Sequence, residues 1–96
     1  MQTPASIERE IRAFLSSNFP LSARGDIDPE QSLVESGVID SLGVLELVEF
    51  VETRFNMRVL EEELLPENLD SIANITHYLS DKLQGDHAAR IEANQP

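Results

Sequence analysis

The sequence predicts an all-α protein, a small four-helix bundle with three main helices, a short third helix and a long first loop. Three observations support this prediction. Apolar residues recur at helical spacing in three separate stretches of the 96-residue chain. Pro20, Gly25 and Pro29 interrupt the chain between the first two stretches. Hydrophobic residues make up 41% of the chain, which is enough for one modest core.

The first helix is expected to begin at Thr3 or Pro4 and to end near Asn18 or Phe19. Threonine is a good helix cap, and proline suits the first helical position. Pro20 disfavours helix in the residue before it, so the helix cannot continue far past Asn18. Its apolar stripe predicts a core contribution from Ile7, Ile11, Phe14 and Leu15.

Residues 20–40 are predicted to form a loop that is longer than usual and must therefore be anchored or functional. The expected anchors are the apolar residues Ile27, Leu33, Val38 and Ile39. The segment that starts at Asp26 is similar to the opening of a calcium-binding loop. However, Gln31 stands where that loop needs glycine and Gly37 where it needs a bidentate glutamate. No metal site is predicted.

The second helix is expected to run from Ser41 to Phe55 or Asn56. Asp40 is a preferred N-cap, because its carboxylate accepts hydrogen bonds from free amides of the first turn. Ser41 then occupies the first helical position, at the positive end of the helix dipole, which favours an attached phosphate. The predicted buried stripe consists of Val44, Leu47, Val48, Val51 and Phe55.

The opposite side of this helix mixes carboxylates with apolar side chains close to Ser41. A purely solvated face has no need of leucines at such positions, so we interpret this face as a partner-binding surface. Leu45 and Glu52 are expected along one flank of the helix. The predicted contact residues are Leu42, Leu45, Glu46, Glu49 and Glu52.

After the charge run 61–63, which is expected to be solvated, Pro66 can open a short helix that reaches Leu69. Leu65 precedes this proline and offers no capping hydroxyl. Ser71 is the expected cap of the last helix, and Gly85 is its expected end. The stripe of this last helix is Ile72, Ile75, Leu79 and Leu83. We therefore expect one domain over residues 1–84 and a disordered tail over residues 85–96.

The sequence around Asp40-Ser41-Leu42 resembles that of acyl carrier and peptidyl carrier proteins. The resemblance includes residues 35–39 before the tripeptide and the acidic amphipathic helix after it, which ends in Arg54-Phe55-Asn56. It extends back to Ser32-Leu33 and forward to residues 66–72, and with the terminal helical patterns it covers residues 4–84. The segment 66–71 differs from the usual fatty-acid carrier sequence. This difference favours a specialised acyl carrier protein. The protein is also expected to be a stand-alone carrier.

The resemblance implies that Ser41 bears a 4′-phosphopantetheine arm, which a phosphopantetheinyl transferase adds from coenzyme A. Acyl or aminoacyl groups would ride on the arm as thioesters and be delivered to partner enzymes. Asp40 would cap the helix and help to position the modification. Residues 1–84 would then be the acyl carrier domain, with no catalytic activity of its own.

The net charge of −11 restricts the class of partner. Residues 26–70 hold thirteen acidic residues against Arg54 and Arg58, so this segment alone accounts for −11. Such a charge disfavours nucleic acids and anionic membranes, and it favours loading and acceptor enzymes with basic surfaces. The sequence contains no run of 18 apolar residues, so no membrane insertion is predicted. Cysteine is absent, so any thiol must come from an added group. We expect a cytoplasmic monomer.

Three alternatives stay open. The protein could be a stand-alone aminoacyl or peptidyl carrier of a nonribosomal-type pathway. It could be an acidic helical adaptor that never receives a cofactor. It could also be a hydrolase in which Ser41 is the nucleophile and His77 or His87 the base, although no Gly-x-Ser-x-Gly motif occurs.

Overall fold

The computed structural model describes residues 3–19 and 27–93, and it describes side chains as far as residue 84. Every regular element in these ranges is helical, which confirms the predicted all-α class. None of the described helices is both long enough and apolar enough to cross a membrane. The elements are α1 (Pro4–Asn18), α2 (Ser41–Arg54), the 3-10 helix η2 (Glu61–Glu63), α3 (Pro66–Leu69) and α4 (Ile72–Ala93).

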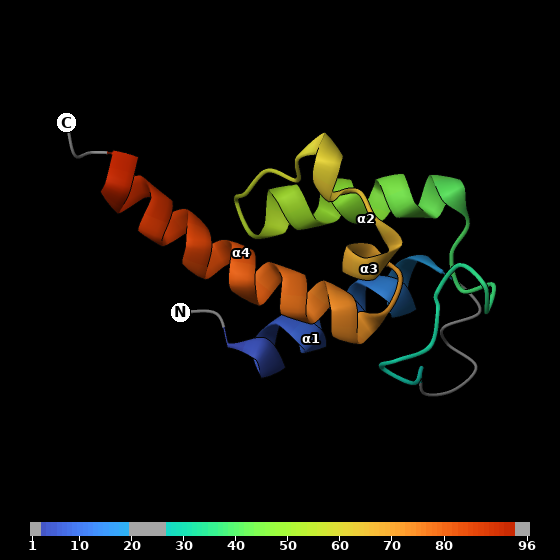
Figure 1. Ribbon diagram of the computed structural model, residues 1–96. Coiled ribbons are helices and arrows are strands. Elements are labelled where there is room, and N and C mark those ends of the chain that lie inside the picture. Colours follow the sequence, from blue (N-terminus) through green and yellow to red (C-terminus); the bar gives the residue numbers. More distant parts are fainter. Residues whose placement is uncertain (1–2, 20–26, 94–96) are drawn as a thin grey trace.

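The helices pack around one apolar core. α1 lies against α4, and the short α3 lies against the beginning of α4 (Figure 1). α2 covers the other side of the bundle, with α3 between α2 and α4 (Figure 1). The side chains that are most completely buried come from three helices and the first loop: Ile7, Ile11, Leu15, Leu33, Leu47, Val51, Ile72, Ile75 and Leu79.

Aromatic and ionic contacts join α1 to α2. The rings of Phe14 and Phe50 stack with their centroids 4.3 Å apart and an interplanar angle of 17°. One turn further along α2, the Arg54 guanidinium forms an ion pair with Glu10 at 2.7 Å between Nε and Oε1. These contacts hold α2 against α1 and thereby fix the direction in which the exposed side of α2 faces.

The predicted helix starts are confirmed. The Thr3 hydroxyl accepts a hydrogen bond from the Ser6 amide at 3.1 Å, and the Ser71 hydroxyl accepts one from the Asn74 amide at 3.0 Å. Pro66 occupies the first turn of α3, and Leu65 before it supplies no side-chain cap. The start of α3 therefore depends on contacts made by neighbouring residues.

The predicted end of the last helix is wrong. α4 continues through Gly85 to Ala93. A glycine inside a helix costs only about 1 kcal/mol relative to alanine, and the alanines and arginine at 88–90 are good helix formers. The helix end at Gly85 was one reason to predict a domain boundary and a tail from residue 85. That reason no longer holds, and the boundary and the tail stay sequence-based predictions.

The buried side of α2 is rotated from the predicted one. Leu47, Val51 and Phe55 are buried as expected, but Val44 and Val48 are only half-buried against the core. Gly43 is buried in their place. The buried line thus follows an i, i+4 spacing, and Val44 is left to line a surface groove.

The first loop is anchored as predicted, and an acidic side chain adds a second anchor. Its apolar residues Ile27, Leu33, Val38 and Ile39 are all buried. Asp70 follows α3, and its carboxylate accepts hydrogen bonds from the Ser32 hydroxyl at 2.5 Å and the Val34 amide at 3.0 Å. Its carbonyl also accepts a hydrogen bond from the Leu33 amide at 2.7 Å. Pro20, Gly25 and Asp26 lie outside the described residues.

Candidate functional site

Ser41 lies at the first position of α2 and is exposed. No described residue forms a hydrogen bond with its hydroxyl. The positive end of the α2 dipole lies beside this hydroxyl, a setting that favours an attached phosphate. Ser41 is therefore accessible from solvent.

Asp40 caps α2 as predicted. Its Oδ1 accepts a hydrogen bond from the Gly43 amide at 2.7 Å, and its carbonyl accepts one from the Val44 amide at 3.0 Å. The first bond satisfies a donor that the first turn would otherwise leave unpaired, and the second is the first regular backbone bond of the helix. Asp40 thereby fixes the backbone on both sides of Ser41.

Gly43 permits a close contact immediately behind Ser41. A Cβ atom added at Gly43 would lie 2.9 Å from Cε1 of Phe19 and 3.0 Å from Cβ of Ile39. The absence of a side chain therefore lets the end of α1 and the first loop pack directly on the first turn of α2. The position of Ser41 depends on this contact.

We expect Gly43→Ala to destabilise the protein, although alanine is the better helix former. Overpacking of this kind costs about 1–3 kcal/mol, whereas the gain in helix propensity is about 1 kcal/mol. Ile39 is the stricter neighbour because its Cβ moves only with the backbone. Urea denaturation of the variant and of Thr53→Ala, which changes an exposed α2 residue, checks this. A Gly43→Ala protein more stable than its parent would contradict the described packing.

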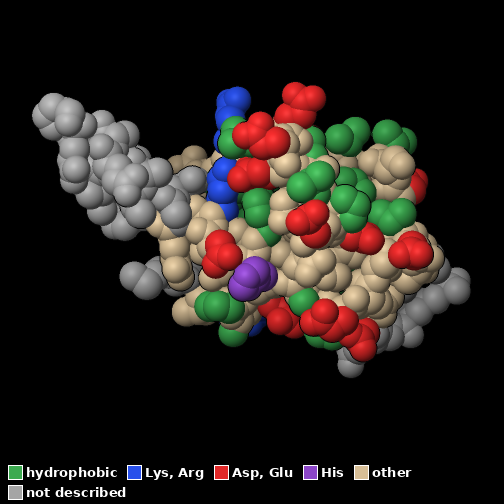
Figure 2. Space-filling model, viewed as in Figure 1, with side chains coloured by type: hydrophobic (Ala, Val, Ile, Leu, Met, Phe, Trp, Pro, Cys, Tyr) green, Lys and Arg blue, Asp and Glu red, His purple; other side chains and the backbone are tan. Residues whose placement is uncertain are grey.

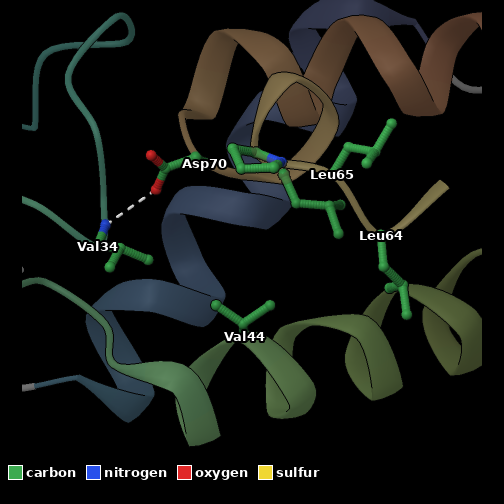
Figure 3. A pocket seen from close by; sticks show the side chains of 7 residues that line it. Val34, Val44, Leu64, Leu65 and Asp70 are labelled. Atoms are coloured by element: carbon green, nitrogen blue, oxygen red, sulfur yellow. Dashed lines mark hydrogen bonds between the residues drawn. The ribbon is translucent and has the colours of Figure 1, made fainter. Parts of the chain in front are cut away.

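An apolar groove begins one helical turn beyond Ser41. It encloses a cavity of about 200 Å³ between α2 and the segment that contains α3 (Figure 3). Val44 faces it from α2, and Val34 closes it from the first loop (Figure 3). Residues i and i+3 share a helix face, so Ser41 and Val44 lie on the same side of α2. The other lining residues are Leu64, Leu65, Pro66, Leu69 and Asp70.

The predicted partner-binding face of α2 is exposed where it was expected to be. Leu42 and Leu45 are 69% and 60% exposed, and Glu46 and Glu49 are exposed as well. Figure 2 shows hydrophobic side chains gathered over α2 and α3, with acidic side chains among and around them. Apolar groups of this size are rarely left together on a surface without a function.

Glu52 is placed differently from the other predicted contact residues. It is half-buried, and its Oε2 accepts a hydrogen bond from the Val59 amide at 2.9 Å. The side chain thus folds over the connection that follows α2 and holds this connection in place. Its carboxylate is less available to a partner than those of Glu46 and Glu49.

Glu63 was expected to be solvated with the rest of its charge run, and this expectation is wrong. Its Oε1 accepts hydrogen bonds from Lys82, Tyr78 and the Leu60 amide. Burial alone would raise the pKa of Glu63, but the hydrogen bonds from Lys82, Leu60 and Tyr78 outweigh burial and hold the pKa below 4.5. The stability that Glu63 contributes is therefore present at neutral pH, where the carboxylate is charged in the folded and unfolded states, and it is lost as the pH falls through the lowered pKa.

His77 does not belong to the surroundings of Ser41. It is exposed on α4, where its Nε2 lies 3.3 Å from the Asp81 carboxylate. His77 lines a polar pocket with Glu63 and Lys82. Asp40 and Leu42, the residues on either side of Ser41, line a different pocket. The side chain of His87, the other proposed base, lies outside the described residues. The described part of the chain also contains no group of acidic and histidine side chains suited to a metal ion.

A known protein family matches most of the chain. The model of a family described as a phosphopantetheine attachment site matches residues 9–79. This range includes Asp40, Ser41, the groove and the exposed face of α2. A comparison with curated proteins found no match. Because the family match spans most of the chain, the protein belongs to the phosphopantetheine attachment site family, whose members receive a 4′-phosphopantetheine group.

Proposed function

We propose that the protein is an acyl carrier protein whose attachment residue is Ser41. The observation that carries this proposal is the exposed hydroxyl at the capped first position of α2, within the matched family range. The chain lacks cysteine, so it has no thiol of its own on which to hold an acyl group. When bound, phosphopantetheine supplies that thiol, on which cargo is held as a thioester.

The residues around Ser41 fit such a group. The Ser41 hydroxyl would form the covalent link, and Asp40 keeps the first turn of α2 in the geometry that exposes this hydroxyl. The apolar groove begins one turn away at Val44. The chain itself binds and orients, and we propose that it performs no catalysis of its own, as is general for carrier domains of this family.

The lining of the groove supports acyl over aminoacyl cargo. Six of the seven lining residues are aliphatic or proline, and Asp70 is the only charged one. The Asp70 carboxylate is already engaged by Ser32 and the Val34 amide. An uncharged hydrocarbon chain therefore suits the groove better than an amino acid with a charged ammonium group. A stand-alone aminoacyl or peptidyl carrier is the alternative, and thioesters identified by mass spectrometry on protein from native cells separate the two.

Incubation with coenzyme A and a phosphopantetheinyl transferase tests the carrier function itself. We expect the intact mass to rise by one phosphopantetheine group. An unchanged mass would favour the adaptor without cofactor. Hydrolysis of simple esters by the unmodified protein would instead favour the hydrolase with Ser41 as nucleophile. Location in the cytoplasm and a monomeric state stay predictions.

We propose that the transferase and the loading and acceptor enzymes dock on the exposed face of α2. Leu42 and Leu45 would fill shallow apolar sites, and Glu46 and Glu49 would meet basic side chains of the partner. Glu52 would contribute less, because the Val59 amide already engages its carboxylate. Exposed ion pairs contribute only about 0.2–1 kcal/mol each, so the charges act mainly by steering encounter.

The double variant Glu46→Lys/Glu49→Lys is expected to slow arm transfer several-fold at low salt, because it reverses the charge that attracts the transferase. The effect should shrink as salt is added. Leu42→Ala should slow transfer with little dependence on salt, because it removes apolar contact area. The measurement is the initial rate of modification against ionic strength.

A matched control for this experiment is Glu61→Lys/Glu62→Lys. It makes the same change of charge at two exposed residues of η2, outside α2. If the control slows transfer as much as the α2 variant does, net charge rather than docking on α2 controls the rate.

A further inference from the structure

The groove wall opposite α2 is attached to α4 through one carboxylate. Oε1 of Glu63 accepts three hydrogen bonds, from Lys82 Nζ at 2.7 Å, the Tyr78 hydroxyl at 2.9 Å and the Leu60 amide at 3.0 Å. Two of these donors belong to α4 and the third to the connection before η2. Glu63 thereby ties the turn that precedes the groove wall to the last helix.

This cluster differs from an ordinary surface ion pair. The Glu63 and Lys82 side chains are only 24% and 14% exposed. Reduced exposure to water strengthens such a contact and makes the loss of one partner costly. The neighbouring Glu61 and Glu62 are exposed. The structure thus singles out one of three consecutive glutamates.

The backbone of Glu63 connects the hydrogen-bonded side chain to the residues that line the groove. Its carbonyl accepts hydrogen bonds from the Leu65 amide at 2.8 Å and from Asn68 Nδ2 at 3.0 Å. Leu64 and Leu65, which follow directly, line the groove (Figure 3). The Glu63 carbonyl thus holds the Leu65 amide and the Asn68 side chain, one immediately before α3 and one within it.

The far end of the same segment is held by Asp70, through the bonds to Ser32 and the Val34 amide. Leu64 and Leu65 therefore lie between two residues whose carboxylates are hydrogen-bonded to other parts of the fold, Glu63 before them and Asp70 after them. Asp70 also anchors the long first loop, so its loss would disturb more than the groove. Loss of the Glu63 hydrogen bonds, in contrast, is expected to affect the groove wall at Leu64 and Leu65 without disturbing the first loop.

We propose that Glu63 is a positioning residue: its carboxylate latches the turn 60–65 to α4 and so sets how far Leu64 and Leu65 close over the groove. The latch controls how well an apolar cargo chain is sheltered there, an inference that rests on the proposed carrier function. We expect breaking the latch to leave Ser41 and the exposed face of α2 in place, because the side-chain hydrogen bonds of Glu63 run to α4 and to Leu60.

Amide hydrogen exchange of the unmodified protein tests the latch without any cargo. In Glu63→Gln and in Lys82→Met we expect exchange at the hydrogen-bonded amides of Leu64, Leu65, Asn68 and Leu69 to accelerate roughly tenfold or more. Glu63→Gln removes the charge of the acceptor and Lys82→Met removes the charged donor. Amides in the middle of α1 should change far less. Glu62→Gln is the matched control, with the same substitution one residue away at an exposed site, and it should leave all rates unchanged.

Two outcomes would overturn the latch. Exchange in Glu63→Gln equal to that in Glu62→Gln would show that the carboxylate does not hold the wall. Equal acceleration in α1 and in residues 64–69 would show that Glu63 contributes only to global stability.

A second measurement tests the effect on cargo. The parent and Glu63→Gln are loaded with an octanoyl group from octanoyl-coenzyme A by a permissive transferase, and the thioester is cleaved with hydroxylamine. We expect faster cleavage in Glu63→Gln, by several-fold, and the parent rate in Glu62→Gln. Accelerated exchange with unchanged cleavage would overturn the control of cargo. A failure to load any of the proteins would count against the carrier function instead, while the exchange data would still decide the latch.

Discussion

Ser41→Ala is expected to abolish attachment of phosphopantetheine while leaving the fold intact. The substitution removes the proposed nucleophilic oxygen, and Ser41 is exposed, with a hydroxyl that forms no hydrogen bond to a described residue. The variant should therefore unfold at the parent's denaturant midpoint. Its intact mass should not change after incubation with coenzyme A and a transferase that fully modifies the parent.

Ser36→Ala is the matched control for this prediction. Ser36 is also an exposed serine close to the start of α2, but it lies in the first loop and its hydroxyl donates to the Leu33 carbonyl. This control should be modified at the parent's rate. A Ser41→Ala protein that still gains the mass would refute the assignment of the attachment residue.

Leu47→Asp is expected to prevent stable folding. Leu47 is fully buried in the core, on the side of α2 that faces away from solvent. An unpaired buried charge costs about 3–5 kcal/mol or more, which is comparable to the whole stability of about 5–15 kcal/mol expected for a small domain. Circular dichroism during thermal unfolding should show either no cooperative transition or a strongly lowered Tm.

Leu45→Asp provides a close comparison, because it makes the same substitution two residues away. Leu45 is 60% exposed, so its replacement should change stability little while disturbing the exposed face of α2. If the two variants melt alike, the described burial of Leu47 is incorrect.

The start of α2 could be predicted from sequence because its structure is determined locally. The Asp40 carboxylate bonds to an amide only three residues further along the chain. The spacing of the apolar residues that follow indicates a helix without information from the rest of the chain. The same reasoning located the starts of α1 and α4 and the four apolar anchors of the first loop. The exposed positions of Leu42, Leu45, Glu46 and Glu49 followed from helical periodicity alone.

The contacts missed by sequence reasoning join residues that are distant in the chain. Glu63 meets Lys82 and Tyr78 only because η2 lies beside α4, and no local pattern distinguishes it from Glu61 or Glu62. Asp70 reaches back to Ser32 across 38 positions. The exact buried line of α2 depended on whether Gly43 or Val44 faces the core, which is decided by how closely Phe19 packs on the helix.

Peptide mapping by tandem mass spectrometry locates the attachment residue, after the parent protein has been treated with coenzyme A and a transferase. The chain contains nine serines, and several others are also exposed. We expect one phosphopantetheine per chain, with the whole of the added mass on Ser41. Mapping of that mass to Ser36 or to any other residue would contradict this expectation.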